Sequence, residues 1–400
     1  MSDSQDKEWG SGVYSLLSWF KSDKVHNAKV LVAGAGALGN EVLKNLALFG
    51  IGNIFIVDFD TIEYSNLTRS VLFRECDADK GLYKAEIAAT KLKEINPNIN
   101  VKCICGRLNT DIGLGLYRRM DVVIGCLDSR IARLQLNRLC MRAGVPWIDG
   151  GIDNLMGNVK VFKYGVSCYE CGLTDNAKAD IFHRLSCAGV ARRNESAGRI
   201  PTTPVIASII GAVEVQEAMK LIHKTEIEEG QFNSLLGKWF HYDGKFLNTS
   251  VYDSAVFEDD CPSHELWDNI IPIDSLGADA TLADTFTTIK NRLAVDNVEI
   301  NLRNDRFVDK IVTRNDEKEY EPMLPESAIP DYIDSKRELY TRLRRELNQH
   351  EYENIDESFP YKYLTLKQIG IPYWDVIQIT TEKGFYYLEL NADKNRFNIE

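Results

Sequence analysis

The sequence predicts an α/β protein with a mostly parallel sheet covered by helices, followed by a smaller α+β unit. Short apolar runs alternate with helix-forming segments from Lys29 to about Lys163, and such alternation is typical of a parallel sheet. A glycine-rich turn follows the first run, and the composition of the chain changes after His264. Because 400 residues exceed the usual size of one core, we expect two or three domains.

Apolar spacing assigns the elements of the first domain. Strands are expected in the runs KVLVAG, NIFIVD, NVKCICG, MDVVIGCLD and PWIDGG, and helices over 39–49, 84–95 and 131–143. Before them, Val13–Phe20 has helical spacing and is expected to pack on the main body or on a second subunit. After them we expect an irregular crossing loop over about 164–201, a buried helix over 203–223 and a hairpin over 239–256.

The segment after His264 has shorter expected elements. Helices are expected over 282–293 and 331–349, and strands over 298–302, 308–312, 366–370, 376–380 and 385–390. Together these elements predict the small α+β unit.

Composition excludes several classes of protein. Hydrophobic residues make up 44% of the chain, but no apolar run approaches the ~18–20 residues of a membrane span. The polar start MSDSQDKEWG differs from a signal peptide, so we expect a cytoplasmic protein. A net charge of −12 argues against a nucleic-acid partner. Nine cysteines then favour metal binding or thiol chemistry over disulfides.

The glycine-rich turn has G-x-G-x-x-G spacing, with Gly34, Gly36 and Gly39 between a strand and a helix. Backbone N–H groups at the start of such a helix, together with its dipole, favour an anion. The next strand ends at Asp58, whose carboxylate is placed to accept hydrogen bonds from ribose hydroxyls. The turn therefore predicts a nucleotide site, although dehydrogenases and methyltransferases share the glycine pattern. Asn66 and Arg69, just beyond it, are not dehydrogenase features and indicate that the site also holds a triphosphate.

Four segments, in order along the chain, carry a family resemblance: GAGALGNEVLKNLALFG, VDFDTIEYSNLTRSVLF, YKAEIAATKL and GCLDSRIARLQLNRLC. They resemble the adenylation domain of the ubiquitin-activating enzyme family and of its bacterial relatives, the adenylyltransferases for thiamine and molybdopterin sulfur carriers. The resemblance runs from about Lys29 to His264 and implies a Rossmann-like adenylation domain that uses ATP and Mg²⁺. Its nucleotide-binding positions fall on Gly34, Gly36, Gly39, Asp58, Asp60, Asn66, Arg69, Lys84 and Asp128.

The resemblance also implies a role for each of these side chains. Asp58 would bind the ribose. Asn66, Arg69 and Lys84 would hold the triphosphate, and the two cations would offset negative charge as a carboxylate attacks the α-phosphate. Asp128 would carry Mg²⁺ through a hard oxygen ligand. Further charged residues are weaker candidates, because capping or helix-surface charges would give the same pattern: Asp60, Arg130 and Arg133.

One position departs from the family. Its members usually supply an arginine from an N-terminal segment across a dimer, but no arginine precedes Arg69 here. Either a lysine such as Lys21 or Lys24 substitutes for it, or a partner subunit brings the charge. We expect a homodimer or a pseudo-dimer and leave the choice between them open.

Two cysteine knuckles predict a metal centre. Cys168 and Cys171 form C-x-x-C, and Cys261 with His264 forms C-x-x-H about ninety residues later. Three thiolates and one imidazole suit a closed tetrahedral zinc site of structural type. The family resemblance supports this prediction, because activating enzymes have two cysteine pairs at these points, with His264 here in place of the fourth cysteine.

Cys187 is the candidate nucleophile. It lies in FHRLSCAGVARR, where nearby arginines could lower the pKa of an exposed thiol. In ubiquitin-activating enzymes the catalytic cysteine follows the first zinc pair at a similar interval, although Ala188 stands here where the family usually has Thr. The alternative is a spare loop cysteine. Four other thiols are expected in the core: Cys103, Cys105, Cys126 and Cys140.

The last region separates branches of the family, because a bare sulfur-carrier adenylyltransferase would end soon after the second knuckle. Tyr363–Leu390 resembles the end of a ubiquitin-fold (β-grasp) domain that recruits a conjugating enzyme, and a dimerisation or lid domain is the alternative. The expected domains are thus an N-terminal helical segment over 1–28, an adenylation domain over 29–264 and a ubiquitin-fold-like domain over 265–400.

The function expected from this resemblance is activation of a ubiquitin-like protein. ATP would adenylate its C-terminus, Cys187 would capture the acyl group as a thioester, and a conjugating enzyme would receive it. The nearest alternative is an adenylyltransferase for a sulfur-carrier protein without a thioester relay. A NAD-dependent oxidoreductase is disfavoured because no His or Tyr is placed as the acid of a hydride step. A catalytically inactive half of a heterodimer is disfavoured by the intact set of Arg69, Lys84 and Asp128.

Overall fold

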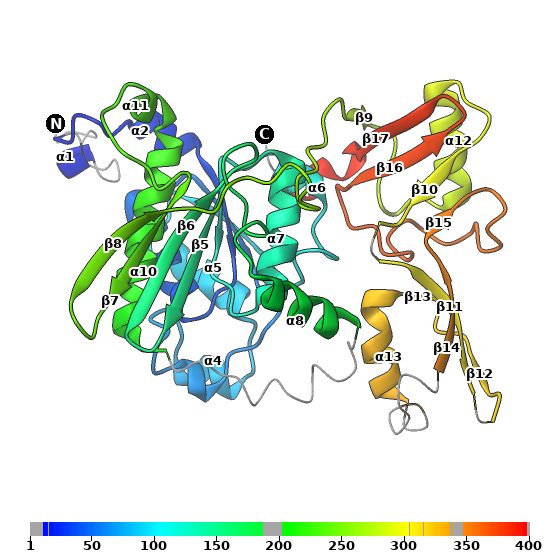
Figure 1. The fold of residues 1–400 in the computed structure, drawn as a ribbon, viewed down its shortest axis with the longest axis horizontal. Coiled ribbons are helices and arrows are strands. Elements are labelled where there is room, and N and C mark those ends of the chain that lie inside the picture. Colours follow the sequence, from blue (N-terminus) through cyan, green and yellow to red (C-terminus); the bar gives the residue numbers. More distant parts are fainter. Residues whose placement is uncertain are drawn as a thin grey trace, which may run out of the picture. The chain divides into compact units, whose positions relative to one another are not determined.

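The structure, a computed structural model, describes residues 11–14, 16–186, 202–303, 305–314, 316–336, 339 and 347–397. It has two compact units (Figure 1). Described residues that fall in 1–109, 117–175 and 199–266 form unit 1, and those in 110–116, 176–198 and 267–400 form unit 2. In these ranges, no helix combines the length and the apolar content that a bilayer crossing requires.

Unit 1 is built on an eight-stranded sheet in the order β3-β2-β1-β4-β5-β6-β7-β8. Strands β3 to β5 of this order pair in parallel, and β6, β7 and β8 are added antiparallel. This confirms the predicted α/β class with a mostly parallel sheet. The strands are β1 (Lys29–Ala33), β2 (Asn53–Val57), β3 (Asn100–Ile104), β4 (Val122–Gly125), β5 (Trp147–Asp153), β6 (Met156–Phe162), β7 (Lys238–Asp243) and β8 (Asn248–Asp253).

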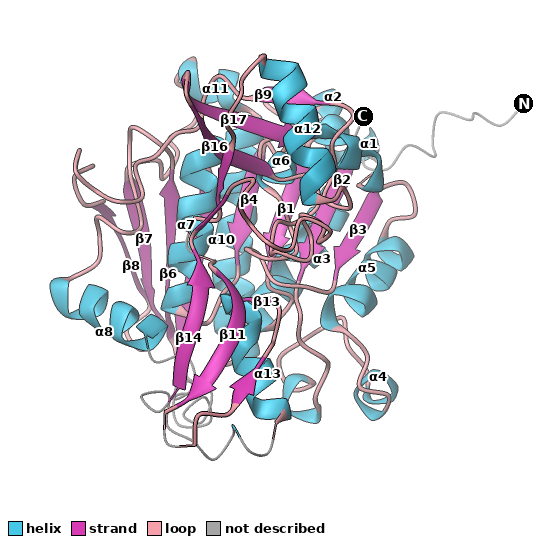
Figure 2. Ribbon diagram, turned by 90° about the vertical axis from the view of Figure 1, so that its right-hand side faces the viewer, coloured by secondary structure: helices cyan, strands magenta, loops and turns pink. Residues whose placement is uncertain are grey.

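Helices cover both faces of this sheet. On one face, α3 (Ala37–Phe49) packs between α5 (Lys84–Ile95) and α10 (Pro204–Ile222), while α7 (Arg130–Ala143) packs on β4 and β5 (Figure 2). The core forms because the central strands are apolar on both faces: Val30, Ile54 and Ile124 are fully buried on one face, and Leu31 and Val123 are fully buried on the other. Shorter helices complete the unit: α1 (Ser11–Tyr14), α2 (Ser22–Asn27), η2 (Tyr64–Asn66), α4 (Glu75–Asp79) and α11 (Lys224–Glu228).

The N-terminal segment packs on unit 1 rather than forming the continuous helix that its spacing suggested. Among the described residues of 13–20, helix α1 ends at Tyr14, and turns lie between 16 and 19. Phe20 packs against the core, and Trp19 lies edge-on to the buried His223 ring. The Lys21 amide donates to His223 Nε2 at 3.0 Å, which anchors the segment at the end of α10.

Unit 2 contains two sheets and its own core. A five-stranded sheet has the order β15-β10-β16-β17-β9 and packs against α12 (Leu282–Leu293), while β11 pairs with β12, β13 and β14 in a second sheet. Residues 110–116 belong to this unit, since the amides of Gly113 and Gly115 donate to the carbonyls of Tyr373 and Trp374. The strands are β9 (Ile271–Ile273), β10 (Glu299–Asn301), β11 (Phe307–Thr313), β12 (Glu319–Tyr320), β13 (Leu324–Pro325), β14 (Leu347–Tyr352), β15 (Asn354–Ile355), β16 (Val376–Thr381) and β17 (Gly384–Leu390). The remaining helices are α6 (Leu114–Tyr117), α8 (Asp175–Ser186), η4 (Glu326–Ala328), α13 (Ile329–Ser335) and η6 (Asn391–Arg396).

Several predicted elements are wrong. The expected irregular loop over 164–201 contains the helix α8. Within the expected helix over 331–349, α13 ends at Ser335, and from Leu347 the chain forms strand β14, paired with β11. The expected strand over 366–370 is a set of turns that ends at Gly370 with φ +100°. Cys103 and Cys105 are exposed rather than in the core, Cys126 is partly buried, and Cys140 is fully buried.

Candidate functional site

Glycine is required at two positions of the loop between β1 and α3. Gly34 has φ +97°, and a Cβ there would lie 2.5 Å from the Cys126 carbonyl oxygen. A Cβ at Gly39 would lie 2.0 Å from the Gly34 carbonyl oxygen. At Gly36, the N-cap of α3, a Cβ would meet nothing within 4 Å. The loop therefore folds tightly against β4 while the start of α3 keeps an open approach, as an anion site requires.

Asn40 braces this loop and was not singled out from the sequence. Its side chain is fully buried, and its Nδ2 donates to the carbonyls of Ala35 and Gly36 at 2.8 and 3.0 Å. Its Oδ1 accepts from the Leu72 amide at 2.8 Å. Asn40 thus joins the loop to the segment just beyond Arg69. An asparagine one residue after Gly39 was the only sequence signal.

Asp58, Asp60 and Lys84 form one group beside the glycine loop. The Asp58 carboxylate accepts from the Ala35 amide at 2.7 Å and the Asp60 amide at 2.8 Å. Lys84, the first residue of α5, places its Nζ 2.7 Å from Asp60 Oδ2, and its amide donates to the Asp60 carbonyl at 2.9 Å. Burial raises the pKa of Asp58, and the Ala35 amide and Lys84 partly offset this. A carboxylate and an ammonium group thus adjoin the loop.

Asn66 and Arg69 lie next to each other in the turns after β2. Asn66 Oδ1 accepts from the Glu63 amide at 2.9 Å, and Arg69 Nη1 donates to the Ser65 carbonyl at 2.6 Å. The Arg69 amide donates to the Asn66 carbonyl at 3.0 Å. In the described part of the chain their hydrogen bonds stay within 63–69, so no bond joins them directly to Lys84.

Asp128 lies in the turn between β4 and α7, at the carboxyl end of the parallel strands. The residue is exposed, and the next residue, Ser129, caps α7 by accepting from the Ala132 amide at 3.4 Å. Ligands of open α/β sheets bind at this end of the strands. The exposed Asp128 carboxylate is thus available to a ligand there.

Cys187 lies outside the described residues. The helix α8 ends at Ser186, directly before it. The structure therefore gives no geometry for this candidate nucleophile.

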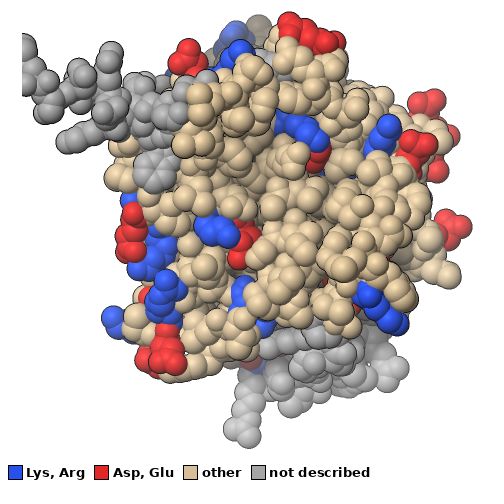
Figure 3. All heavy atoms as spheres, turned by 90° about the vertical axis from the view of Figure 1, so that its left-hand side faces the viewer, with Lys and Arg blue, Asp and Glu red and all other residues tan. Residues whose placement is uncertain are grey.

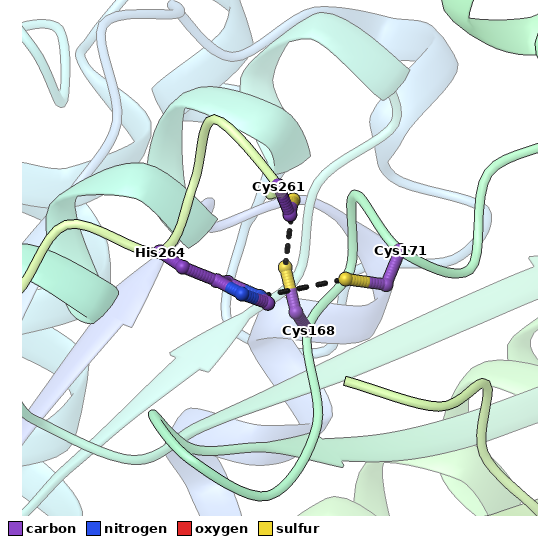
Figure 4. Close-up of side chains that lie close together, drawn as sticks. All are labelled: Cys168, Cys171, Cys261 and His264. Atoms are coloured by element: carbon purple, nitrogen blue, oxygen red, sulfur yellow. Dashed lines mark hydrogen bonds between the residues drawn. The ribbon is translucent and has the colours of Figure 1, made fainter. Parts of the chain in front are cut away.

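The four predicted metal ligands meet at one point. The Cys168, Cys171 and Cys261 thiols and the His264 ring place one ligand atom each within 4.8 Å of one another (Figure 4). Cys171 Sγ is 3.4 Å from His264 Nε2, and Cys168 Sγ is 4.0 Å from Cys261 Sγ. The first pair follows β6 and the second follows β8, so a strand hairpin and α10 separate them in sequence. Three soft thiols and an imidazole nitrogen are a donor set that fits zinc.

The surroundings of this cluster are fixed by further contacts. The His264 ring stacks on Phe257, with centroids 3.4 Å apart. Asn137 Nδ2 donates to Cys168 Sγ at 3.3 Å, while its Oδ1 accepts from Trp147 Nε1 and the Tyr169 amide. Burial raises the pKa values of the Cys171 and Cys261 thiols and lowers that of His264. A bound cation would displace the thiol protons.

Comparisons with known proteins identify the family of this chain. The ThiF family profile matches residues 15–263. A molybdopterin-synthase adenylyltransferase from Haemophilus influenzae is 33% identical over 228 residues, which are 56% of this chain and 85% of that protein. A SAMP-activating enzyme E1 from Haloferax volcanii is 30% identical over 236 residues, 59% of this chain and 80% of that protein.

A SUMO-activating enzyme subunit 2 from Dictyostelium discoideum is 40% identical over 163 residues, which are 40% of this chain. The match spans about a quarter of that relative, 24% of its length. Among solved structures, Escherichia coli MccB with ATP is 26% identical, covers 60% of this chain and 67% of that chain, and has a TM-score of 0.48. Since the profile covers more than half of the chain, and two relatives at 30% identity or more are matched over most of their length, this chain belongs to the ThiF family of E1-like activating enzymes.

Proposed function

We propose that this protein activates a ubiquitin-like protein in two covalent steps. The C-terminal carboxylate of the partner attacks the α-phosphate of ATP and forms an acyl-adenylate, while pyrophosphate leaves. The Cys187 thiol then loses its proton and attacks the acyl carbon, which forms a thioester and releases AMP. A conjugating-enzyme cysteine takes the acyl group from Cys187 by exchange of one thioester for another.

The observation that carries the adenylation step is the group of Asp58, Asp60 and Lys84 beside the glycine loop. Asp58 holds the loop through the Ala35 amide and would bind the ribose with its other lone pairs. Lys84 stands at the first turn of α5, where its charge and the helix dipole both favour phosphate. Asn66 and Arg69 would hold the triphosphate from the neighbouring turn. Family membership adds a second, independent line of support.

Two cations fit the residues present. Mg²⁺ is usually held by one or two carboxylates together with substrate phosphates, and Asp128 offers an exposed carboxylate at the right end of the sheet. When bound, Mg²⁺ would neutralise charge on the triphosphate. Zinc would be held by Cys168, Cys171, Cys261 and His264, a closed set of four that leaves no position for a substrate. We therefore propose a structural role for zinc.

The thioester step is tested on Cys187. With ATP and the ubiquitin-like partner, wild type should form an adduct that reductant removes, whereas Cys187→Ala should form none and still exchange pyrophosphate into ATP. Cys187→Ser should trap a slower, reductant-resistant ester. The exposed Cys76, outside this chemistry, provides the control Cys76→Ala, which should behave as wild type. A labile adduct on Cys187→Ala would move the nucleophile elsewhere.

The second candidate function is adenylation of a sulfur-carrier protein without a thioester relay. It is favoured by the match to the molybdopterin-synthase adenylyltransferase, of which the chain covers 85%. On this hypothesis wild type would exchange pyrophosphate in the presence of the carrier, yet no protein adduct would appear on any cysteine. The adduct gel therefore separates the two candidates.

Unit 2 is proposed to recruit the conjugating enzyme. Its five-stranded sheet and single packed helix have the size of a ubiquitin-like domain, and Tyr363 and Phe385 are strongly exposed on it. Large exposed aromatic side chains are typical of interaction surfaces. Tyr363→Ala with Phe385→Ala should slow transfer to the conjugating enzyme and leave the Cys187 adduct unchanged. Unchanged transfer would favour a dimerisation or lid role.

We also propose that two copies of the chain associate through the outer side of α10. This helix is apolar on nearly all sides, yet Val205 is 64% exposed and Ala212 is exposed two turns later. The face of the molecule on which α10 lies carries few charged side chains (Figure 3). Ala212→Glu should turn a sedimenting dimer into a monomer, whereas Tyr363→Glu in unit 2 should not. A monomeric wild type would contradict this proposal.

A further inference from the structure

Arg133 joins the ends of two strands at the candidate nucleotide site. It lies in the first turn of α7, and its Nη2 donates to the Leu127 carbonyl at 2.7 Å and to the Gly150 carbonyl at 3.1 Å. Its Nε is 2.9 Å from Asp149 Oδ1. Leu127 follows β4, whereas Asp149 and Gly150 belong to β5. One guanidinium therefore ties the loop after β4 to the neighbouring strand.

This contact is shielded from solvent. The Asp149 side chain is 4% exposed and that of Arg133 is 19% exposed. Burial raises the pKa of Asp149, while Arg133 and Lys160 lower it. Removing the guanidinium would leave a buried carboxylate without its nearest cation, and such a loss is strongly unfavourable. The contact of Arg133 with Asp149 and the two carbonyls, here called the Arg133 clamp, is thus a buried link between β4 and β5 rather than a surface ion pair.

The clamp acts on the backbone next to Asp128. Leu127 directly precedes Asp128, and Ser129, directly after it, accepts the Arg133 amide on its carbonyl at 3.0 Å. The residues on both sides of Asp128 are therefore hydrogen-bonded to Arg133. The Nε and Nη2 atoms of the guanidinium thus face protein groups, namely two carbonyls and a carboxylate. This differs from the direct nucleotide contact that the sequence suggested for Arg133.

We infer that Arg133 is a positioning residue that orients Asp128 toward the divalent cation carried by ATP. This inference rests on the proposed adenylation function. The affinity of the nucleotide should then depend on Arg133 in the presence of Mg²⁺ and hardly at all in its absence. An arginine is required because its planar fork reaches two carbonyls and Asp149 at once, which the single ammonium of lysine cannot do.

The test compares three full-length variants: Arg133→Met, Arg133→Lys and Arg142→Met. Arg142 is the matched control, since it lies on the same helix, its side chain is 16% exposed, and its Nε is 2.9 Å from Glu265 Oε2. Calorimetry measures the affinity for a non-hydrolysable ATP analogue with and without Mg²⁺, and pyrophosphate exchange is then titrated with Mg²⁺.

Both Arg133 variants should need about 10- to 100-fold more Mg²⁺, the usual loss when a residue that orients a metal ligand is removed. Their affinity for the metal-free analogue should change less than about 2-fold, and Arg142→Met should match wild type. An equal loss with and without Mg²⁺, or an unchanged Mg²⁺ requirement, would overturn the inference and leave Arg133 a purely structural residue.

Two further results keep the test decisive. If Arg133→Met does not fold, Arg133→Lys decides, because it retains a cation beside Asp149. If wild type itself binds no nucleotide, the proposed function fails, and the inference fails with it. If wild type binds Mg²⁺-ATP and exchanges pyrophosphate while both variants match it, the inference alone fails.

Discussion

The cysteine–histidine cluster and the glycine-loop region of unit 1 use polar side chains in different ways. In the cluster, three buried thiols and an imidazole point toward one another, and Asn137 and Phe257 fix their surroundings. In the glycine-loop region, the Asp60 side chain is half exposed and Asp128 is exposed, while backbone amides hold Asp58. The first arrangement suits a ligand that never leaves, and the second suits one that is exchanged in each cycle. Substitutions should therefore affect stability at the cluster and turnover at the loop.

Asp128→Ala should give the largest effect on turnover. Without its carboxylate the cation on ATP loses its protein ligand, and we expect pyrophosphate exchange to fall by at least about 100-fold. The melting temperature should stay within about 2 °C of wild type, because the side chain is exposed. A normal exchange rate in this variant would contradict the assignment of the nucleotide site.

Loss of a thiol from the cluster should give the largest effect on stability. Cys261→Ser should remove one bound zinc ion per chain and lower the free energy of unfolding by several kcal/mol, since the energy of metal binding is part of the folding energy. Elemental analysis and thermal melting measure the two effects. Cys76→Ser, at an exposed cysteine, is the control. An unchanged melting temperature after chelation of the metal would contradict a structural role for zinc.

Asn40→Ala changes the glycine-loop region without removing a charge. The substitution leaves the buried Leu72 amide and two carbonyls without their partner, which should cost about 1–3 kcal/mol. Nucleotide affinity should fall as well, since the loop loses its brace. Asn100→Ala, which removes only a 3.3 Å bond to Asn53, should change both quantities less. If Asn40→Ala and Asn100→Ala changed stability and nucleotide affinity equally, Asn40 would not be the residue that braces the loop.

Glu214→Gln tests a buried carboxyl group of unit 1, and its effect on stability depends on pH. Glu214 is fully buried on α10, and burial raises the pKa of its carboxyl group well above the usual value, which Arg133 and the Gly150 backbone only partly offset. Below the pKa of the unfolded chain, near 4.5, both states are protonated. Above it only the unfolded chain ionises, which weakens folding by about 1.4 kcal/mol per pH unit until the folded group ionises too.

Glutamine does not ionise, so it removes this pH-dependent loss of folding free energy. The melting temperature of Glu214→Gln should therefore rise relative to that of wild type as the pH rises from 5 to 8. Glu217, one turn later, is the control because its carboxylate accepts from the Leu235 amide and pairs with Lys220. Glu217→Gln should be destabilised at both pH values. A pH-independent difference for Glu214→Gln would mean that the carboxyl is not held protonated.

The sequence predicted what local patterns determine. The alternating apolar runs gave the strands and helices of unit 1, and the knuckle spacing gave the four ligand positions that meet in the structure. Prediction from the sequence failed where a strand or side chain depends on partners that are distant along the chain. The first three residues of β14 were expected to end a helix, because the pairing of this strand with β11, about forty residues earlier, leaves no local signal. Cys103 and Cys105 were expected in the core, but Cys103 lies in the edge strand β3 and Cys105 directly follows that strand, and both are exposed.

Within the site, charged residues could be named from the sequence but their partners could not. Asn40 was missed because its three hydrogen bonds go to backbone groups that only the fold brings together. Arg133 was identified, but as a nucleotide contact, because its bonds to Leu127 and Gly150 depend on how β4 and β5 end side by side. The role of Cys187 stays a prediction.

The most direct test of the central claim is pyrophosphate exchange by the wild-type protein, measured with and without a candidate ubiquitin-like partner. We expect labelled pyrophosphate to enter ATP only when the partner is present with a free C-terminal carboxylate, since that group is the nucleophile. A partner blocked as the C-terminal amide should give no exchange. Exchange that ignores the partner's C-terminus, or none with any ubiquitin-like or sulfur-carrier protein encoded beside this gene, would contradict the account.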